Sequence, residues 1–121
     1  MKMLGKHIIL ELHGVEPEIL NNKELLEKIL SEAALKAGGR ILGSFFHEFN
    51  PHGVTGIIAI AESHLSIHTW PEFKYAAIDI FTCRGIDPRK AADYIIEKLR
   101  PRNHFTITLS RGEPYKEELE S

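Results

Sequence analysis

The sequence predicts an α+β fold: a two-layer α/β sandwich in which a mainly antiparallel sheet carries two helices on one face. Two observations predict it. The expected elements follow the order β-α-β-β-β-β-α-β, so four strands succeed one another without a helix between them, and such strands pair antiparallel. Both helical segments have an apolar stripe, which is typical of helices that cover one face of a sheet. The length of 121 residues fits a single domain, residues 1–121.

The N-terminal part predicts a strand, a helix and a strand. Residues 7–12 are mostly apolar and predict a buried strand. A helix follows, with Asn21 or Asn22 as its N-cap and an apolar stripe over residues 25–37. Residues 40–49 predict the next strand, which ends at a turn indicated by the composition of residues 50–53, Asn-Pro-His-Gly.

The remaining part predicts four more strands and a second helix. Pro17 and Pro71 are interpreted as breaks between elements. Asp87 followed by Pro88 predicts the start of the second helix. The further strands are expected at residues 54–61, 64–70, 75–82 and 104–109.

Composition excludes several partners. The formal net charge is −2, which gives no electrostatic reason to expect nucleic acid or an anionic membrane as a partner. The single cysteine, Cys83, excludes an intrachain disulfide and fits a reducing compartment. We find no signal peptide and no apolar stretch of membrane-spanning length. We therefore expect a cytoplasmic protein.

One expected strand carries an unusual number of polar groups. The segment from Glu62 to Glu72 has the sequence ESHLSIHTWPE. A lone histidine in a strand is usually a hydrogen-bonded structural residue, but this segment combines two histidines, two serines and two glutamates. Local pattern and fold tend to disagree at functional sites, so the segment is the main candidate for chemistry.

A metal site is one alternative, because His64 and His68 have an H-x-x-x-H spacing. In a strand this spacing separates the two Cα atoms by roughly 13 Å. Metal–nitrogen bonds of about 2.0–2.1 Å do not reach across that gap. We therefore expect no metal.

A serine hydrolase is a second alternative. Ser63 lacks the G-x-S-x-G elbow that presents a nucleophile on a sharp turn. Serine, histidine and glutamate close in sequence do not define a triad, because a triad is defined by geometry. This alternative is not favoured.

A third interpretation rests on a resemblance. The segment from Glu62 to Glu72 resembles the processing-site signature of the prokaryotic S-adenosylmethionine decarboxylase proenzymes. The similarity runs from about residue 4 to about residue 100, and the last twenty residues match poorly. Further matching blocks are Gly5-Lys6-His7, Phe46-His47, Gly53-Val54-Thr55-Gly56, Ala76-Ala77-Ile78-Asp79 and Phe81-Thr82-Cys83.

The resemblance implies self-cleavage between Glu62 and Ser63, into a 1–62 chain and a 63–121 chain. Ser63 would attack the Glu62 carbonyl and become a pyruvoyl group, and His68 would act as the processing base. Thr55 stands where the family more often has serine; it keeps the hydroxyl and would support processing.

The resemblance also implies the activity, a carboxy-lyase that decarboxylates S-adenosylmethionine for spermidine and other polyamines. The pyruvoyl group would form a Schiff base with the substrate and take the role of pyridoxal phosphate. Cys83 would be the proton donor, although composition alone favours a small buried hydrophobe there. Phe49, Trp70 and Glu72 are candidates for binding the substrate, the first two by stacking and the last through the ribose.

Two other functions stay open. The first is a pyruvoyl-dependent arginine decarboxylase on the same scaffold, which the resemblance allows because some archaeal relatives act on arginine. The second is a catalytically silent binding module with this fold. The presence of Ser63, His68 and Cys83 argues against a silent module.

The uncovered face of the sheet predicts a homodimer of cleaved protomers. Phe45, Phe46, Phe49 and Trp70 are expected on central strands, and part of this set must point away from the helices because side chains alternate along a strand. Large apolar groups of this kind are usually buried against a partner. We therefore expect a two-fold dimer.

Overall fold

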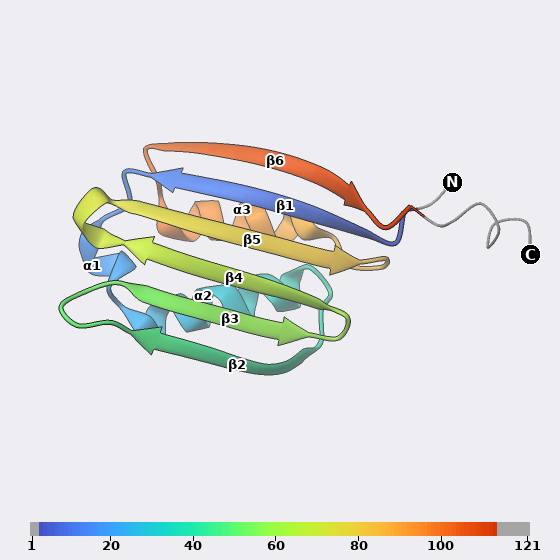
Figure 1. Cartoon of the computed structure of the whole chain (residues 1–121), viewed down its shortest axis with the longest axis horizontal. Coiled ribbons are helices and arrows are strands. Elements are labelled where there is room, and N and C mark those ends of the chain that lie inside the picture. Colours follow the sequence, from blue (N-terminus) through green and yellow to red (C-terminus); the bar gives the residue numbers. More distant parts are fainter. Residues whose placement is uncertain (1–2, 114–121) are drawn as a thin grey trace, which may run out of the picture.

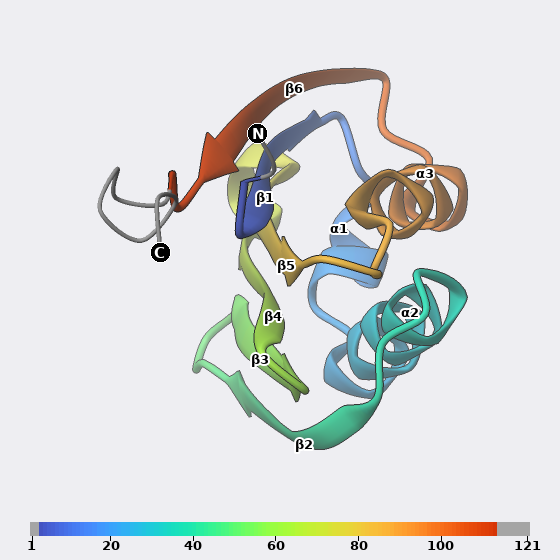
Figure 2. The ribbon, with the colours of Figure 1, turned by 90° about the vertical axis from the view of Figure 1, so that its right-hand side faces the viewer.

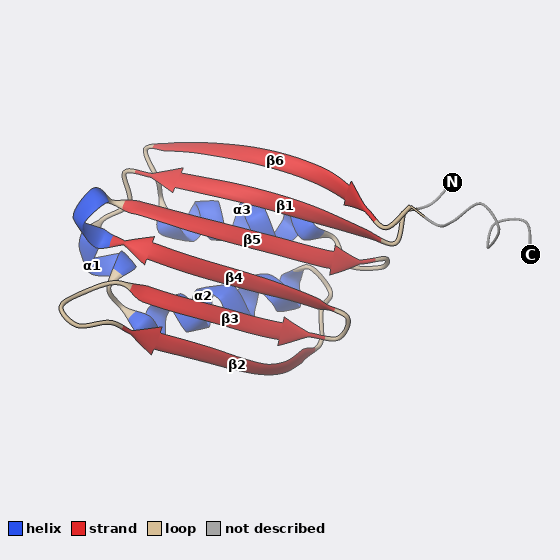
Figure 3. Ribbon diagram, in the orientation of Figure 1, coloured by secondary structure: helices blue, strands red, loops and turns tan. Residues whose placement is uncertain are grey.

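The computed structural model describes residues 3–113, which form a six-stranded antiparallel sheet in the order β2-β3-β4-β5-β1-β6 (Figure 1). All five strand pairs are antiparallel. The strands are β1 (Gly5–His13), β2 (Ile41–Glu48), β3 (Val54–Ile60), β4 (Ser63–Trp70), β5 (Tyr75–Cys83) and β6 (Asn103–Arg111). The other elements are the helices α1 (Pro17–Leu20), α2 (Lys23–Lys36) and α3 (Pro88–Leu99) and the 3-10 turn η1 (Pro71–Phe73), shown in Figure 3.

The helices α2 and α3 cover the same face of the sheet, as the edge-on view in Figure 2 shows. The side chain of Asn22 caps α2 by accepting a hydrogen bond from the Leu25 N–H, and that of Asp87 caps α3 through the Arg89 N–H. Both caps pair N–H groups that have no partner within the helix.

The hydrophobic core lies between the two helices and the sheet. Side chains alternate along β5, so that every second residue, from Ala76 to Thr82, is buried. From the helices, the core takes Leu26, Ile29, Leu30, Ala91, Ala92, Ile95 and Leu99. We call the other side of the sheet the open face; on β4 it carries His64, Ser66, His68 and Trp70.

The predicted fold class and element order are confirmed, and element ends differ by at most two residues. Two elements were missed, α1 and η1, each a single turn that begins with a proline. Pro17 and Pro71 were interpreted only as breaks. A proline is also well accommodated at the first position of a helical turn, because its missing N–H would have no partner there.

The expectation that the phenylalanines lie on central strands was wrong for all three of them. Phe45 and Phe46 belong to β2, which is an edge strand because it pairs only with β3. Phe46 packs against the core over Gly56, where an added Cβ would lie 2.0 Å from the Phe46 ring. Phe45 is 64% exposed on the open face. Trp70 is on a central strand, as expected, and Phe49 directly follows β2.

No helix within residues 3–113 is long and apolar enough to cross a membrane.

Candidate active site

Glu62 and Ser63 lie at the turn that joins β3 to β4. The φ angle of Glu62 is 63°, in the left-handed region that residues with a side chain seldom adopt. A backbone held in this region stores strain, on the order of 1–3 kcal/mol. Ser63 follows as the first residue of β4 and is half-buried. The peptide bond between them therefore sits at a strained and accessible turn.

Cys83 lies directly beside this turn, at the end of β5. Its N–H donates a hydrogen bond to the Ser63 Oγ at 3.0 Å. Its Sγ lies 4.0 Å from the Glu62 Oε1 and 4.0 Å from the Ala61 carbonyl oxygen. Antiparallel pairing of β4 and β5 thus gathers Glu62, Ser63 and Cys83, which we call the cleavage end.

His68 and Thr55 form a second group. They are directly opposite each other in the pairing of β3 and β4, and the Thr55 Oγ1 lies 3.0 Å from the His68 Nδ1. His68 is five residues along β4 from Ser63, which separates their Cα atoms by roughly 16 Å. An odd separation also puts the two side chains on opposite sides of the strand. Within one chain, His68 therefore does not reach Ser63.

A pair of stacked aromatic side chains lies beside His68 on the open face. The His68 ring centroid lies 6.5 Å from that of Trp70, and Trp70 stacks on Tyr75 at 5.3 Å. The Tyr75 hydroxyl donates a hydrogen bond to the Glu11 Oε2 at 2.6 Å. Burial, followed by this contact with Glu11, raises the pKa of Tyr75 to about 12, so the phenol stays neutral at physiological pH.

Two more candidates lie at this end of the sheet. Phe49 is 48% exposed, and its ring is 4.6 Å from that of His47. Glu72, on η1, forms an ion pair with His52 at 3.1 Å. We call Phe49, Thr55, His68, Trp70 and Glu72 the aromatic end.

Separate hollows in the surface border the two ends, and one of about 470 Å³ at the aromatic end is lined by His52 and Glu72. Another of about 680 Å³ is lined by Cys83 together with Lys6, Thr82 and Arg84. A third of about 330 Å³ is lined by Trp70, Phe73 and Tyr75 with Glu11 and His13. None of these hollows includes residues of both ends.

The structure thus divides the predicted site residues into two groups, and sequence reasoning missed two of their neighbours. Tyr75 is directly opposite Trp70 in the pairing of β4 and β5, a contact that the hairpin register alone implies. His52 contacts Glu72 from a loop twenty positions away, and no local pattern signals that contact. Within residues 3–113 there is no group of three or more histidine, cysteine, aspartate or glutamate side chains that would hold a metal ion.

Comparison with known proteins places the chain in a family. The model of the S-adenosylmethionine decarboxylase family matches residues 6–112. The chain belongs to this family. The match extends further toward the C-terminus than the resemblance found in the sequence, and that resemblance is confirmed.

Named relatives agree with the family match. An S-adenosylmethionine decarboxylase proenzyme of Caldicellulosiruptor saccharolyticus is 52% identical over 113 residues, 93% of this chain and 91% of the relative. The proenzyme of the same name from Acetivibrio thermocellus is 45% identical over 120 residues, 96% of this chain and 97% of the relative.

A solved structure agrees as well. The adenosylmethionine decarboxylase of Aquifex aeolicus has a TM-score of 0.89 and 35% identity, and the match covers 96% of this chain and 97% of that one. None of these relatives carries the name of an arginine decarboxylase, so the arginine alternative is not supported.

Proposed function

We propose that this chain is a self-processing, pyruvoyl-dependent decarboxylase of S-adenosylmethionine that supplies the aminopropyl donor for spermidine synthesis. It cleaves itself between Glu62 and Ser63 into a 1–62 chain and a 63–121 chain. The observation that carries this proposal is the cleavage end, where the Ser63 Oγ lies at a strained turn and accepts the Cys83 N–H at 3.0 Å.

Cleavage begins when the Ser63 Oγ attacks the Glu62 carbonyl carbon and the peptide nitrogen leaves that carbon, which converts the amide into an ester. Release of the left-handed backbone at Glu62 favours this step. A base then removes the Cα proton of residue 63, the Cβ–O bond breaks, and Glu62 departs as a carboxylate. The enamine that remains at residue 63 tautomerises to an imine. Water then adds to the imine carbon and ammonia leaves, so that a ketone remains at Cα.

The Cys83 N–H would stabilise the leaving group in this series of steps. The Oγ that accepts it in the uncleaved chain becomes an oxygen of the departing Glu62 carboxylate. Negative charge therefore develops on the atom to which this N–H already donates. The residues present also fit the pyruvoyl group, which supplies the electron-accepting carbonyl that pyridoxal phosphate supplies elsewhere, without a metal.

If His68 is the base, it must come from a second chain. His68 lies roughly 16 Å along β4 from Ser63 in the same chain. The Ser63 side chain takes the helix side of the sheet, whereas the His68 side chain takes the open face. We therefore propose a two-fold dimer in which the open faces meet and the partner's His68, with its Thr55, serves each Ser63.

The open face has the composition that such a dimer needs. Two contacts pair its central charges: the His7 Nε2 lies 2.9 Å from the Asp79 Oδ1, and the Arg111 Nη1 donates to the His7 Nδ1 at 3.2 Å. Paired charges are less costly to bury than isolated ones. Around them lie apolar side chains between 40% and 64% exposed, namely Phe45, Ile57, Trp70, Phe105, Ile107 and Leu109.

In this dimer each complete site combines the cleavage end of one protomer with the aromatic end of the other. The aromatic rings of Phe49 and Trp70 offer faces for the adenine and the sulfonium. Glu72 offers its carboxylate to the ribose hydroxyls, and Cys83 delivers the final proton. A thiol that donates protons must stay reduced, so we propose a cytoplasmic enzyme.

Complementation between two inactive variants tests the proposal. His68→Ala keeps the serine, and Ser63→Ala keeps the base; each expressed alone should stay largely uncleaved. Co-expressed, they should form heterodimers in which the His68→Ala chain is cleaved, and intact mass should show its two fragments. No cleavage in the mixture, or normal cleavage of His68→Ala alone, would rule out a base supplied by the partner. Wild-type protein that releases no carbon dioxide from S-adenosylmethionine would refute the activity.

A further inference from the structure

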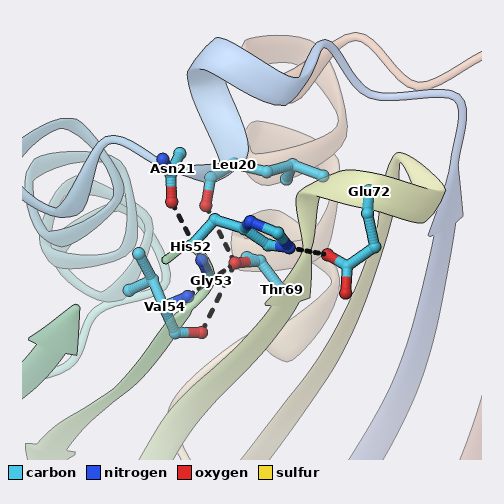
Figure 4. Close-up of polar contacts among 7 residues, drawn as sticks. All are labelled: Leu20, Asn21, His52, Gly53, Val54, Thr69 and Glu72. Carbon is cyan, nitrogen blue, oxygen red and sulfur yellow. Dashed lines mark hydrogen bonds and ion pairs between the residues drawn. The ribbon is translucent and has the colours of Figure 1, made fainter. Parts of the chain in front are cut away.

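The loop between β2 and β3 reaches across to η1 and contacts Glu72, as Figure 4 shows. The His52 Nε2 lies 3.1 Å from the Glu72 Oε1, and the two side chains are 39% and 41% exposed. A carboxylate oxygen is an acceptor only, so this ion-pair contact is attractive when the Nε2 facing it carries a proton. The contact joins two segments that are separated in sequence by the strands β3 and β4 and the turn between them.

The backbone around His52 is held by one hydrogen bond to another segment and by one within the loop. The Gly53 N–H donates to the Asn21 Oδ1 at 2.9 Å, and the Phe49 N–H donates to the Gly53 carbonyl oxygen at 2.8 Å. Gly53 has a φ of 105°, which a residue with a side chain rarely adopts. The loop therefore has one defined path between Phe49 and β3.

Thr69 connects the same loop to β4 and α1. Its Oγ1 accepts a hydrogen bond from the Val54 N–H at 2.8 Å and donates one to the Leu20 carbonyl oxygen at 2.8 Å. Thr69 is 7% exposed, so these bonds are shielded from water. Through them, the imidazole of His52 is presented to Glu72 from a fixed backbone.

This contact leaves half of the carboxylate available. Among the residues that the structure describes, the Glu72 Oε2 has no hydrogen-bond or ion-pair partner, and Figure 4 shows it turned away from His52. One oxygen held and one open is the state in which a carboxylate accepts a ligand hydroxyl with least loss of side-chain entropy.

We propose that His52 is a positioning residue for substrate binding: its ion pair with the Oε1 of Glu72 holds the carboxylate so that the Oε2 accepts a hydrogen bond from a ribose hydroxyl. The inference rests on the proposed function, in which Glu72 contacts the ribose. His52 touches neither the scissile peptide nor the reacting carbon, so it acts on binding and leaves the chemical steps unchanged.

Steady-state decarboxylation of S-adenosylmethionine by cleaved enzyme provides the test. His52→Ala should raise KM about tenfold and change kcat by less than about twofold. His52→Gln, whose amide N–H can donate to the same oxygen, should recover most of the loss. His104→Ala, at an exposed histidine of β6, is the matched control and should keep the wild-type KM.

Two further measurements separate positioning from a general structural effect. In a Glu72→Gln background, His52→Ala should add little, because the group it positions is gone. With S-adenosylmethionine that lacks both ribose hydroxyls, His52→Ala and wild type should bind equally well. Uncleaved Ser63→Ala protein allows the same comparison by titration, independent of turnover.

The outcomes distinguish this inference from the proposed function. If the wild type decarboxylates and His52→Ala keeps its KM, the inference fails while the function stands. A loss of equal size in the Glu72→Gln background, or with the substrate that lacks hydroxyls, also overturns it. A wild type with no decarboxylase activity overturns both.

Discussion

The two ends of strand β4 differ in how much of their geometry one chain supplies. At the cleavage end, Ser63 has a contact from Cys83 and a strained neighbour in Glu62, all within one chain. At the aromatic end, His68 has Thr55 as its hydrogen-bond partner and faces outward with Trp70.

This difference has a physical origin. A strand keeps residues five positions apart at a fixed distance, so no side-chain rotation brings His68 to Ser63. Two copies of the domain placed face to face, as proposed above, would bring such groups together. In the proposed dimer, the two-fold axis pairs unlike ends and produces two equivalent sites.

The largest expected effect is at the cleavage end. Ser63→Ala should remain a single chain and show no decarboxylase activity, because alanine forms neither the ester nor the ketone. Intact mass under denaturing conditions provides the measurement. Ser66→Ala, on the same strand, is the control and should cleave normally. Two fragments from Ser63→Ala would show that the bond breaks by another route.

Cys83 separates formation of the cofactor from its use. Cys83→Ala should still cleave, because its backbone N–H remains to contact Ser63. Turnover should fall by about two to four orders of magnitude, the usual contribution of a general acid. Fragment mass and steady-state kinetics on the same sample test both parts. Turnover at the wild-type rate would instead assign Cys83 a packing role.

The smallest expected effect is on the free energy of unfolding, and it differs between two buried threonines, one near each end of the sheet. Thr69→Val removes hydrogen bonds to Leu20 and Val54 and should lower the free energy of unfolding by about 1–3 kcal/mol. Thr82→Val should be neutral or slightly stabilising, because the buried Thr82 Oγ1 has no hydrogen-bond partner among the described residues. Urea unfolding of the uncleaved Ser63→Ala protein measures both. Equal effects would show that the contacts of Thr69 contribute little.

Local structure followed closely from the sequence. Strand alternation, the caps at Asn22 and Asp87, and the processing-site segment all depend on residues a few positions apart, so each was recognisable in the linear order. The exceptions were α1 and η1, where a proline that ends one element also begins a single turn.

The sequence by itself determined the element order, the two-layer class and the resemblance at Glu62 to Glu72. Only the tertiary structure decided that β2 is an edge strand, that Cys83 lies beside Ser63, and that His52 reaches Glu72. The physical reason is the separation in sequence between the residues that set each feature. Periodicity and capping are set by neighbouring residues, whereas strand order and cross-strand contacts depend on the packing of segments that are remote in sequence.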